Sequence, residues 1–175
     1  MHKDVDRILV TDEEISKRCK ELGEEISNYY KEDTPILIGL LKGSVPFLAE
    51  LVKNVVIDIE MDFMDVSSYS GTESTEVKIL KDVECSVNGR SLLIVEDIVD
   101  TGKTIQAVKE LLYSKGAKDV KIISLLDKPS RRKVDIIADW IGFEIPDEFV
   151  IGYGLDYNQK YRNLPYVGVI KKSAI

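Results

Sequence analysis

The chain has 175 residues, of which 44% are hydrophobic and 31% are charged, and its formal net charge is −7. These values fit one globular domain, residues 1–175, that is large enough to bury a core. The negative charge disfavours nucleic acid as the main partner, because duplex binding requires a basic face. No run approaches the roughly 18 apolar residues of a membrane span, and the charged start lacks a signal-peptide core, so we expect a cytoplasmic protein without a membrane partner.

The chain has few histidine and cysteine residues that could bind a metal or take part in catalysis. His2 is the only histidine, and Cys19 and Cys85 lie far apart without a C-x-x-C pair. A zinc site, a disulfide or histidine-based catalysis is therefore disfavoured. We expect any bound metal to use oxygen ligands, as Mg²⁺ does.

The predicted elements alternate between helices and strands along the chain. Residues 11–14 form a capping box, and a helical stripe of apolar residues follows it as far as Tyr30. A further helix is expected at 45–52 and another after Thr104. Apolar strands are expected at 36–41, 55–64, 92–95, 120–126, 136–141 and 166–170. This alternation predicts an α/β fold with a largely parallel sheet.

The most informative segment, residues 92–105, passes from an apolar strand through adjacent acids into a Thr/Gly turn that opens a helix. Unpaired backbone N–H groups at a helix N-terminus favour an anion such as phosphate. Glu96 and Asp97 are expected to end the strand just before this turn. Because ionised carboxylates only accept hydrogen bonds, this arrangement suits a ligand with both a phosphate and vicinal hydroxyls.

This segment has two other possible interpretations. Gly102, Lys103 and Thr104 match the last three residues of a Walker A loop, but that loop needs a glycine where this chain has Asp97. The acids and threonines could instead only cap a helix. Capping would explain one acid and leave the others clustered where ligands of open α/β sheets bind.

The segment 96–104 resembles the phosphoribosyl pyrophosphate loop of the type I phosphoribosyltransferases. Further matches stand in the order and spacing of the hypoxanthine-guanine phosphoribosyltransferase family: Leu41-Lys42-Gly43, Ser68-Tyr69, Lys128 and residues 142–162. The resemblance covers about residues 8–170. It implies the type I phosphoribosyltransferase fold, with a largely parallel central sheet flanked by helices and a small hood built from the terminal segments.

The resemblance also implies an activity in purine salvage. The 5-phosphoribosyl group of phosphoribosyl pyrophosphate would pass to N9 of hypoxanthine or guanine, giving IMP or GMP and pyrophosphate, with Mg²⁺ as cofactor. Asp127 before Lys128 and Pro129 after it leave the acceptance of xanthine open. A homo-oligomer, either a dimer or a tetramer, is expected by resemblance alone.

Site residues follow from the same resemblance. The group that binds phosphoribosyl pyrophosphate comprises Lys42, Gly43, Glu96, Asp97, Asp100, Thr101, Gly102, Lys103, Thr104 and Arg162. Lys128, Phe149 and Val150 would bind the purine, and Glu96, Asp97 and Asp156 would serve the metal. Ser68 and Tyr69 belong to the expected lid, residues 67–76. In the family the peptide bond at the Leu41–Lys42 junction is cis, which the sequence itself does not show.

Asp100 is the candidate general base, placed near purine N7, although helix capping is its alternative role. Without the resemblance, Lys42 would be a solvated loop lysine, Phe149 a core residue, and Asp156 part of a polar turn. Lys103 could equally contact the phosphate or point to solvent.

Two kinds of alternative function remain: a different phosphoribosyltransferase activity, and a role without catalysis. A uracil or adenine phosphoribosyltransferase would share residues 96–104 but should lack Lys128 and the Phe149-Val150 pair. A regulator that keeps the fold without catalysis is disfavoured by Asp100, Lys128, the lid and Arg162. A turnover assay separates these alternatives.

Overall fold

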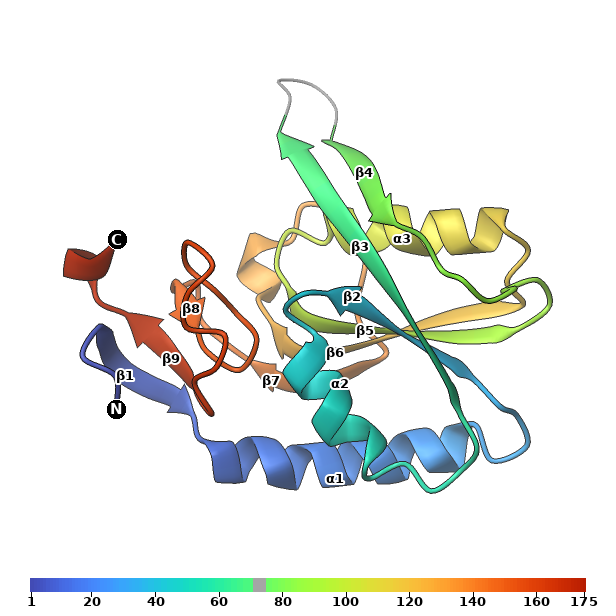
Figure 1. Ribbon diagram of the computed structural model, residues 1–175, viewed down its shortest axis with the longest axis horizontal. Helices are drawn as coiled ribbons and strands as arrows, with labels where there is room; N and C mark the ends of the chain where they lie inside the picture. Colours follow the sequence, from blue (N-terminus) through green and yellow to red (C-terminus); the bar gives the residue numbers. More distant parts are fainter. Residues whose placement is uncertain (71–74) are drawn as a thin grey trace.

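The computed structural model describes residues 1–70 and 75–175, and its main element is a six-stranded sheet (Figure 1). The strand order is β4-β3-β2-β5-β6-β7. Neighbouring strands are parallel except for the antiparallel pair β3–β4 at one edge. The expected α/β class is therefore confirmed. The strands are β2 (Ile36–Leu41), β3 (Glu60–Ser70), β4 (Thr75–Lys81), β5 (Ser91–Val99), β6 (Asp119–Asp127) and β7 (Trp140–Glu144).

Helices cover both faces of this sheet. On one face lie α1 (Asp12–Tyr29) and α2 (Val45–Val52), and on the other lies α3 (Lys103–Ser114). In β5, Leu93 and Val95 pack in the core cluster of α1 and α2, whereas Leu92 and Ile94 pack in the cluster of α3. Strands buried on both faces are continuously apolar, and this property made β5 recognisable from the sequence.

The predicted capping box fixes the start of α1. The Thr11 side chain accepts a hydrogen bond from the Glu14 N–H, and the Glu14 carboxylate accepts one from the Thr11 N–H at 2.8 Å. Cys19 is buried in this helix, and both cysteines are free. Within the described residues, no helix is both long enough and apolar enough to span a membrane.

A second sheet joins segments that are distant in the sequence. Its order is β1-β9-β8, with β1 (Val5–Val10), β9 (Val167–Ile170) and β8 (Val150–Ile151) all antiparallel to their neighbours. We call it the terminal sheet, because both chain ends lie beside it (Figure 1). It sits next to the carboxyl ends of the parallel strands. Two short 3₁₀ helices, η1 (Pro129–Arg131) and η2 (Lys172–Ala174), complete the described elements.

Three predicted strand boundaries were wrong. The strand expected at 55–64 begins only at Glu60, because its partner β2 begins at Ile36 and pairs Ile36 with Glu60. The strand expected at 136–141 is instead β7, because β6 first pairs at Ile123 with Trp140. Glu96 does not end β5, which continues to Val99 alongside β6. Residues 55–59 and 134–138 pack against the core without joining the sheet.

Candidate active site

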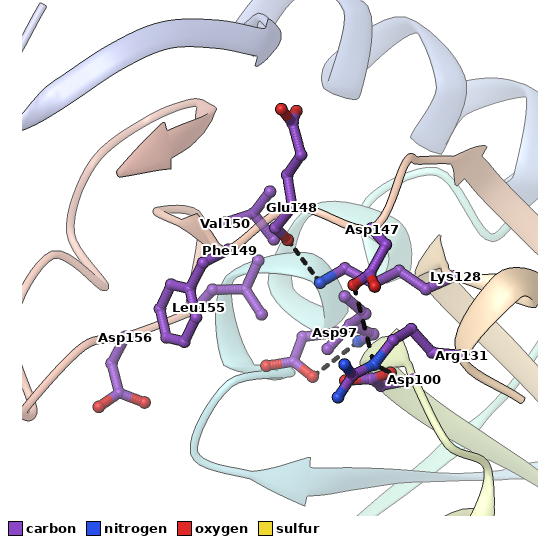
Figure 2. A pocket seen from close by; sticks show the side chains of 11 residues that line it. Asp97, Asp100, Lys128, Arg131, Asp147, Glu148, Phe149, Val150, Leu155 and Asp156 are labelled. Carbon is purple, nitrogen blue, oxygen red and sulfur yellow. Dashed lines mark hydrogen bonds and ion pairs between the residues drawn. The ribbon is translucent and has the colours of Figure 1, made fainter. Parts of the chain in front are cut away.

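A cavity of about 370 Å³ opens at the carboxyl edge of the main sheet, where it faces the terminal sheet (Figure 2). Ligands of open α/β sheets bind at this edge. The cavity brings together six of the predicted site residues: Asp97, Asp100, Lys128, Phe149, Val150 and Asp156. Ile98, Arg131, Asp147, Glu148 and Leu155 also line it, and none of these five is among the predicted site residues.

The Thr/Gly turn forms a smaller adjoining cavity of about 160 Å³, lined among others by Glu96, Thr101, Gly102 and Thr104. Gly102 is the N-cap of α3 and has a φ of 83°, which a side chain would strain. A Cβ there would also lie 2.6 Å from the Ile136 side chain. Among the described residues, the Asp100 side chain accepts no hydrogen bond from the first turn of α3, so its interpretation as a cap is wrong; the hydroxyl of Thr101 accepts one from the Lys103 N–H at 3.4 Å.

The paired acids of β5 stand in an environment that opposes their charge. Asp97 packs against the backbone of Gly43 so closely that a Cβ on Gly43 would lie 1.6 Å from Asp97 Oδ2. Burial raises the pKa of Glu96 well above its ordinary value, and the neighbouring Asp97 carboxylate adds to this effect. Burial also raises the pKa of Asp97. A ligand that brings hydroxyl donors or a cation would relieve this repulsion.

The loop after β2 reaches the same edge. The Leu41–Lys42 peptide bond, whose isomer the sequence left open, is cis, as the family resemblance implies. Lys42 is exposed and Gly43 is buried. A Cβ on Gly154 would lie 1.9 Å from the Gly43 carbonyl oxygen, so this loop touches the segment that follows the terminal sheet strand β8.

Lys128 enters the cavity from the end of β6. Its side chain is nearly buried, with 7% of the residue exposed, and its Nζ donates to the Glu148 carbonyl oxygen at 2.6 Å (Figure 2). Phe149 is 48% exposed and packs edge-on against Tyr157, with ring centroids 5.6 Å apart. Val150 is buried in β8. An apolar ring and a buried ammonium thus face one cavity.

The residues that flank Lys128 in the sequence include an ion pair between Asp127 and Arg132. The Arg132 guanidinium forms an ion pair with the buried Asp127, and its Nη1 donates to the carbonyl oxygens of Val99 at 3.1 Å and Asp100 at 2.6 Å. This contact fastens the end of β5 to the segment that carries Lys128. No sequence pattern indicates this ion pair, because a five-residue spacing across a turn matches neither helical nor strand periodicity.

Asp156 lines the cavity and forms an ion pair with Arg162, which is not among the residues that line it; we call this pair the rim. Arg162 Nη2 is 2.8 Å from Asp156 Oδ1, and Arg162 Nη1 donates to the Gly154 carbonyl at 2.7 Å. Among the described residues, no three His, Cys, Asp or Glu side chains form a metal-binding group. Asp156 therefore does not join Glu96 and Asp97 in one cluster of ligands.

The expected lid lies partly outside the described residues, because residues 71–74 are not among them. The backbone of Ser68 pairs with Val77, and that of Tyr69 pairs with Glu76, within the β3–β4 hairpin.

Residues 8–158 match the family model for the phosphoribosyl transferase domain. The hypoxanthine-guanine phosphoribosyltransferase of Bacillus subtilis is 54% identical over 173 residues, which cover 98% of this chain and 96% of that protein. The chain belongs to the hypoxanthine-guanine phosphoribosyltransferase family. The family enzyme of Lactococcus lactis is also 54% identical, with 98% of this chain and 94% of that protein covered.

Solved structures of the family agree with this assignment. A hypoxanthine phosphoribosyltransferase from Staphylococcus aureus has a TM-score of 0.96 at 46% identity, covering 99% of this chain and 96% of that one. The hypoxanthine phosphoribosyltransferase of Trypanosoma cruzi, solved in complex with the product IMP, has a TM-score of 0.95 at 37% identity and covers 100% of this chain and 99% of that one.

Proposed function

We propose that this protein transfers the 5-phosphoribosyl group of phosphoribosyl pyrophosphate to N9 of hypoxanthine or guanine, giving IMP or GMP and releasing pyrophosphate. Its role would be purine salvage. One observation carries the proposal: Asp97 and Asp100 of the phosphoribosyl loop line one cavity with Lys128, Phe149 and Val150, and Asp100 also lines the smaller cavity formed by the turn residues of that loop. Membership of the family, with relatives matched over nearly their full length, gives independent support.

The phosphoribosyl half of the site uses the turn after β5. Backbone N–H groups of residues 101–104 suit the 5′-phosphate, because the smaller cavity lies at the N-terminus of α3. Asp100, Thr101, Gly102 and Thr104 shape this cradle. Lys103 begins the helix, and its side chain would reinforce the phosphate site.

The carboxylates of Glu96 and Asp97 would accept hydrogen bonds from the ribose 2′- and 3′-hydroxyls, directly or through Mg²⁺. The raised pKa values of both groups fit a partner that brings positive charge. Mg²⁺ is usually held by one or two carboxylates together with substrate phosphates and water, so this pair is sufficient. The ion would neutralise charge on the leaving pyrophosphate. Asp156 would assist from the rim.

Pyrophosphate would lie between the loop after β2 and the rim. We assign its contacts to the backbone around Lys42 and Gly43 and to the Arg162 guanidinium, which is oriented by Asp156. Arginine suits this role because its planar N–H groups match phosphate oxygens. Ser68 and Tyr69 would close over the reacting sugar as a lid and keep water from it.

The purine would lie between these contacts and the terminal sheet. Phe149 would stack on the ring, the main chain of Val150 would meet the Watson–Crick edge, and Lys128 would donate to O6. An ammonium has three donors, so Lys128 can keep its bond to the Glu148 carbonyl while it binds O6. The assigned contacts do not involve the additional oxo group of xanthine, so they do not decide whether xanthine is a substrate.

The reaction begins as the bond from the anomeric carbon to pyrophosphate weakens and the sugar becomes oxocarbenium-like. Purine N9 supplies the electron pair for the new bond, with inversion at the anomeric carbon, and pyrophosphate leaves with the electrons of the old bond. Asp100 would accept the proton that the purine loses at N7. The residues around the cavity hold both reactants in line and stabilise the charge that develops.

We extend the proposal to a cytoplasmic homo-oligomer. Phosphoribosyl pyrophosphate, pyrophosphate and the nucleotide products are highly charged phosphates, which do not cross membranes unaided. A dimer or tetramer is what the resemblance implies, and light scattering of the purified protein measures it.

Steady-state rates with hypoxanthine, guanine, xanthine and adenine, each with and without Mg²⁺, test the proposal. We expect Mg²⁺-dependent turnover of the first two bases and rejection of adenine. A uracil or adenine phosphoribosyltransferase would show another base preference, and a regulator without catalysis would bind the nucleotide without turnover. Undiminished turnover in excess chelator would remove Mg²⁺ from the proposal.

A further inference from the structure

The ion pair between Asp127 and Arg132 lies between the two halves of the candidate site. Arg132 Nη2 binds the Asp127 carboxylate, while Arg132 Nη1 donates to the carbonyl oxygens of Val99 and Asp100. Only 15% of the Arg132 side chain and 7% of the Asp127 side chain are exposed. The neighbouring Arg131 differs, because its side chain is 48% exposed and contacts the Asp100 carboxylate, at 3.1 Å, instead of the backbone.

The backbone of the turn after β5 is held by the segment that contains Arg132. The Val99 carbonyl oxygen accepts a second hydrogen bond from the Lys128 N–H at 3.0 Å. The Thr101 carbonyl oxygen accepts one from the Lys133 N–H at 2.9 Å. Three consecutive carbonyl groups, at residues 99–101, therefore accept hydrogen bonds from this one segment.

The aliphatic part of Arg132 also packs against the phosphate cradle. A Cβ on Gly102, the N-cap of α3, would lie 3.0 Å from Arg132 Cδ. The arginine thus contacts the cradle both through its guanidinium and through its stem.

Asp127 links the same pair to the purine half. It directly precedes Lys128, and its carbonyl oxygen accepts a hydrogen bond from the Ile145 N–H at 2.9 Å. Ile145 begins the segment whose Glu148 carbonyl accepts the hydrogen bond from Lys128 Nζ (Figure 2). The pair therefore contacts both the backbone that would bind the 5′-phosphate and the residue next to the proposed O6 donor.

The burial of this pair favours a role in geometry over a role in stability. A buried ion pair often stabilises a fold no better than apolar residues of similar volume, because both charges lose their water. Apolar side chains could fill the space, but they could not bind two carbonyl oxygens and a carboxylate together. A planar guanidinium can, because its N–H groups point in several fixed directions.

We infer that Arg132 and Asp127 are positioning residues of the proposed reaction: together they hold the phosphate cradle and Lys128 at the separation that a nucleotide requires. The inference rests on the proposed function, in which the cradle binds the 5′-phosphate and Lys128 binds purine O6. Loss of the pair should weaken a ligand that contacts both halves at once, such as IMP. Phosphoribosyl pyrophosphate has no purine and should be affected much less, whereas a merely structural role would affect both ligands alike.

The test compares the Kd values of IMP and phosphoribosyl pyrophosphate, each with Mg²⁺, by isothermal titration calorimetry of the wild type and of Arg132→Lys. Lysine keeps a positive charge beside Asp127, but its compact ammonium cannot reproduce the planar fork that reaches both carbonyl oxygens. A hydrogen bond to a charged group such as Lys128 is worth roughly ten- to a hundred-fold in affinity, so we expect the Kd of IMP to rise by about that factor. The Kd of phosphoribosyl pyrophosphate should stay within about three-fold, because its contacts lie in one half of the site.

The matched control is Arg18→Lys. Arg18 also donates to a backbone carbonyl, that of Ile141 at 3.0 Å, and also binds two acids, Glu21 and Glu25. It lies on α1 and lines neither cavity of the site. The ratio of the two Kd values should therefore be the same in Arg18→Lys as in the wild type.

Thermal unfolding of each variant shows whether the fold is retained. If Arg132→Lys does not fold, the double variant Asp127→Asn/Arg132→Gln carries the same comparison, because it removes both buried charges together and leaves neither unpaired. Equal weakening of the two ligands, unchanged binding of IMP, or the same change of ratio in Arg18→Lys would overturn the inference. Failure of the wild-type protein to bind IMP and phosphoribosyl pyrophosphate would instead overturn the proposed function.

Discussion

Asp100 lies where the two halves of the cavity meet, so its replacement separates chemistry from binding. Asp100→Asn keeps the size of the side chain and an oxygen for Arg131 but cannot accept the purine proton. We expect kcat to fall by roughly 10²–10⁴, with little change in the affinity for phosphoribosyl pyrophosphate. Single-turnover rates and equilibrium binding measure the two effects. A loss confined to affinity would mark Asp100 as a structural residue.

Lys128 tests how the purine is selected. Its ammonium only donates hydrogen bonds, so it matches O6 of hypoxanthine and guanine but opposes the amino group of adenine. A site that leaves a buried donor unpaired can discriminate by about 10⁴–10⁵. Lys128→Gln offers either a donor or an acceptor, so kcat/KM for the 6-oxopurines should fall and the preference over adenine should shrink. If the preference for 6-oxopurines over adenine is unchanged in this variant, Lys128 does not recognise O6, and purine selection must be assigned to Phe149 and Val150.

At the scale of elements, Asp62 joins β3 to the loop after β4. Its Oδ2 accepts hydrogen bonds from the backbone N–H groups of Glu84 at 2.8 Å and Cys85 at 2.9 Å. Burial opposes ionisation of Asp62, but these bonds and one from Phe63 outweigh it and lower the pKa of Asp62. The resulting stabilisation is present above the unfolded pKa of about 3.9 and is lost as pH falls through the lower folded value.

Asp62→Asn should therefore reduce the free energy of unfolding by about 1–3 kcal/mol at pH 7, because one accepting oxygen becomes a donor. The difference from wild type should narrow as pH falls below about 4 and through the lower pKa of folded Asp62, because the wild-type carboxyl then becomes protonated as well. Thermal unfolding at several pH values measures this. Asp58→Asn, at an exposed position before β3, is the matched control. If the difference in unfolding free energy between Asp62→Asn and wild type did not depend on pH, the ionised Asp62 carboxylate would not be the source of the stabilisation.

Elements that carry their own signal could be predicted from the sequence. The buried strand β2 and the helix α2 have the predicted bounds, because each is a short apolar run with polar or glycine residues beside it. By contrast, β1, β4 and β8 were missed, and their pairing partners define them more than their own residues do. The start of β3 depends likewise on where β2 begins.

The same division applies to the site. Residues 96–104 are contiguous, so their motif predicted a turn at the sheet edge. Arg131 and the Asp127–Arg132 pair act through contacts between separate loops, and no periodicity announces such contacts.

At the scale of the whole molecule, the cavity joins two sheets, because Asp100 follows β5 of the main sheet and Val150 belongs to β8 of the terminal sheet. A nucleotide bound there should stabilise both. With IMP at 100 times its Kd, we expect about 2.7 kcal/mol of added stability and a Tm rise of roughly 5–10 °C.

Hydrogen exchange should slow both around residues 98–104 and around β8 and β9 when IMP binds. AMP at the same concentration is the control and should have a smaller effect, because Lys128 faces its 6-amino group. Protection of only one of the two sheets would show that the ligand does not bridge them.

The pairing of Val5 with Ile170 sets an order of events during protein synthesis. Strand β1 leaves the ribosome early, yet its partner β9 follows only after the main sheet has been translated. Such distant pairing is slow to form, and an unpaired strand edge invites association with other chains. The nascent protein can thus complete its main sheet first. The purine pocket forms last, when β9 pairs with β1 on one side and with β8 on the other.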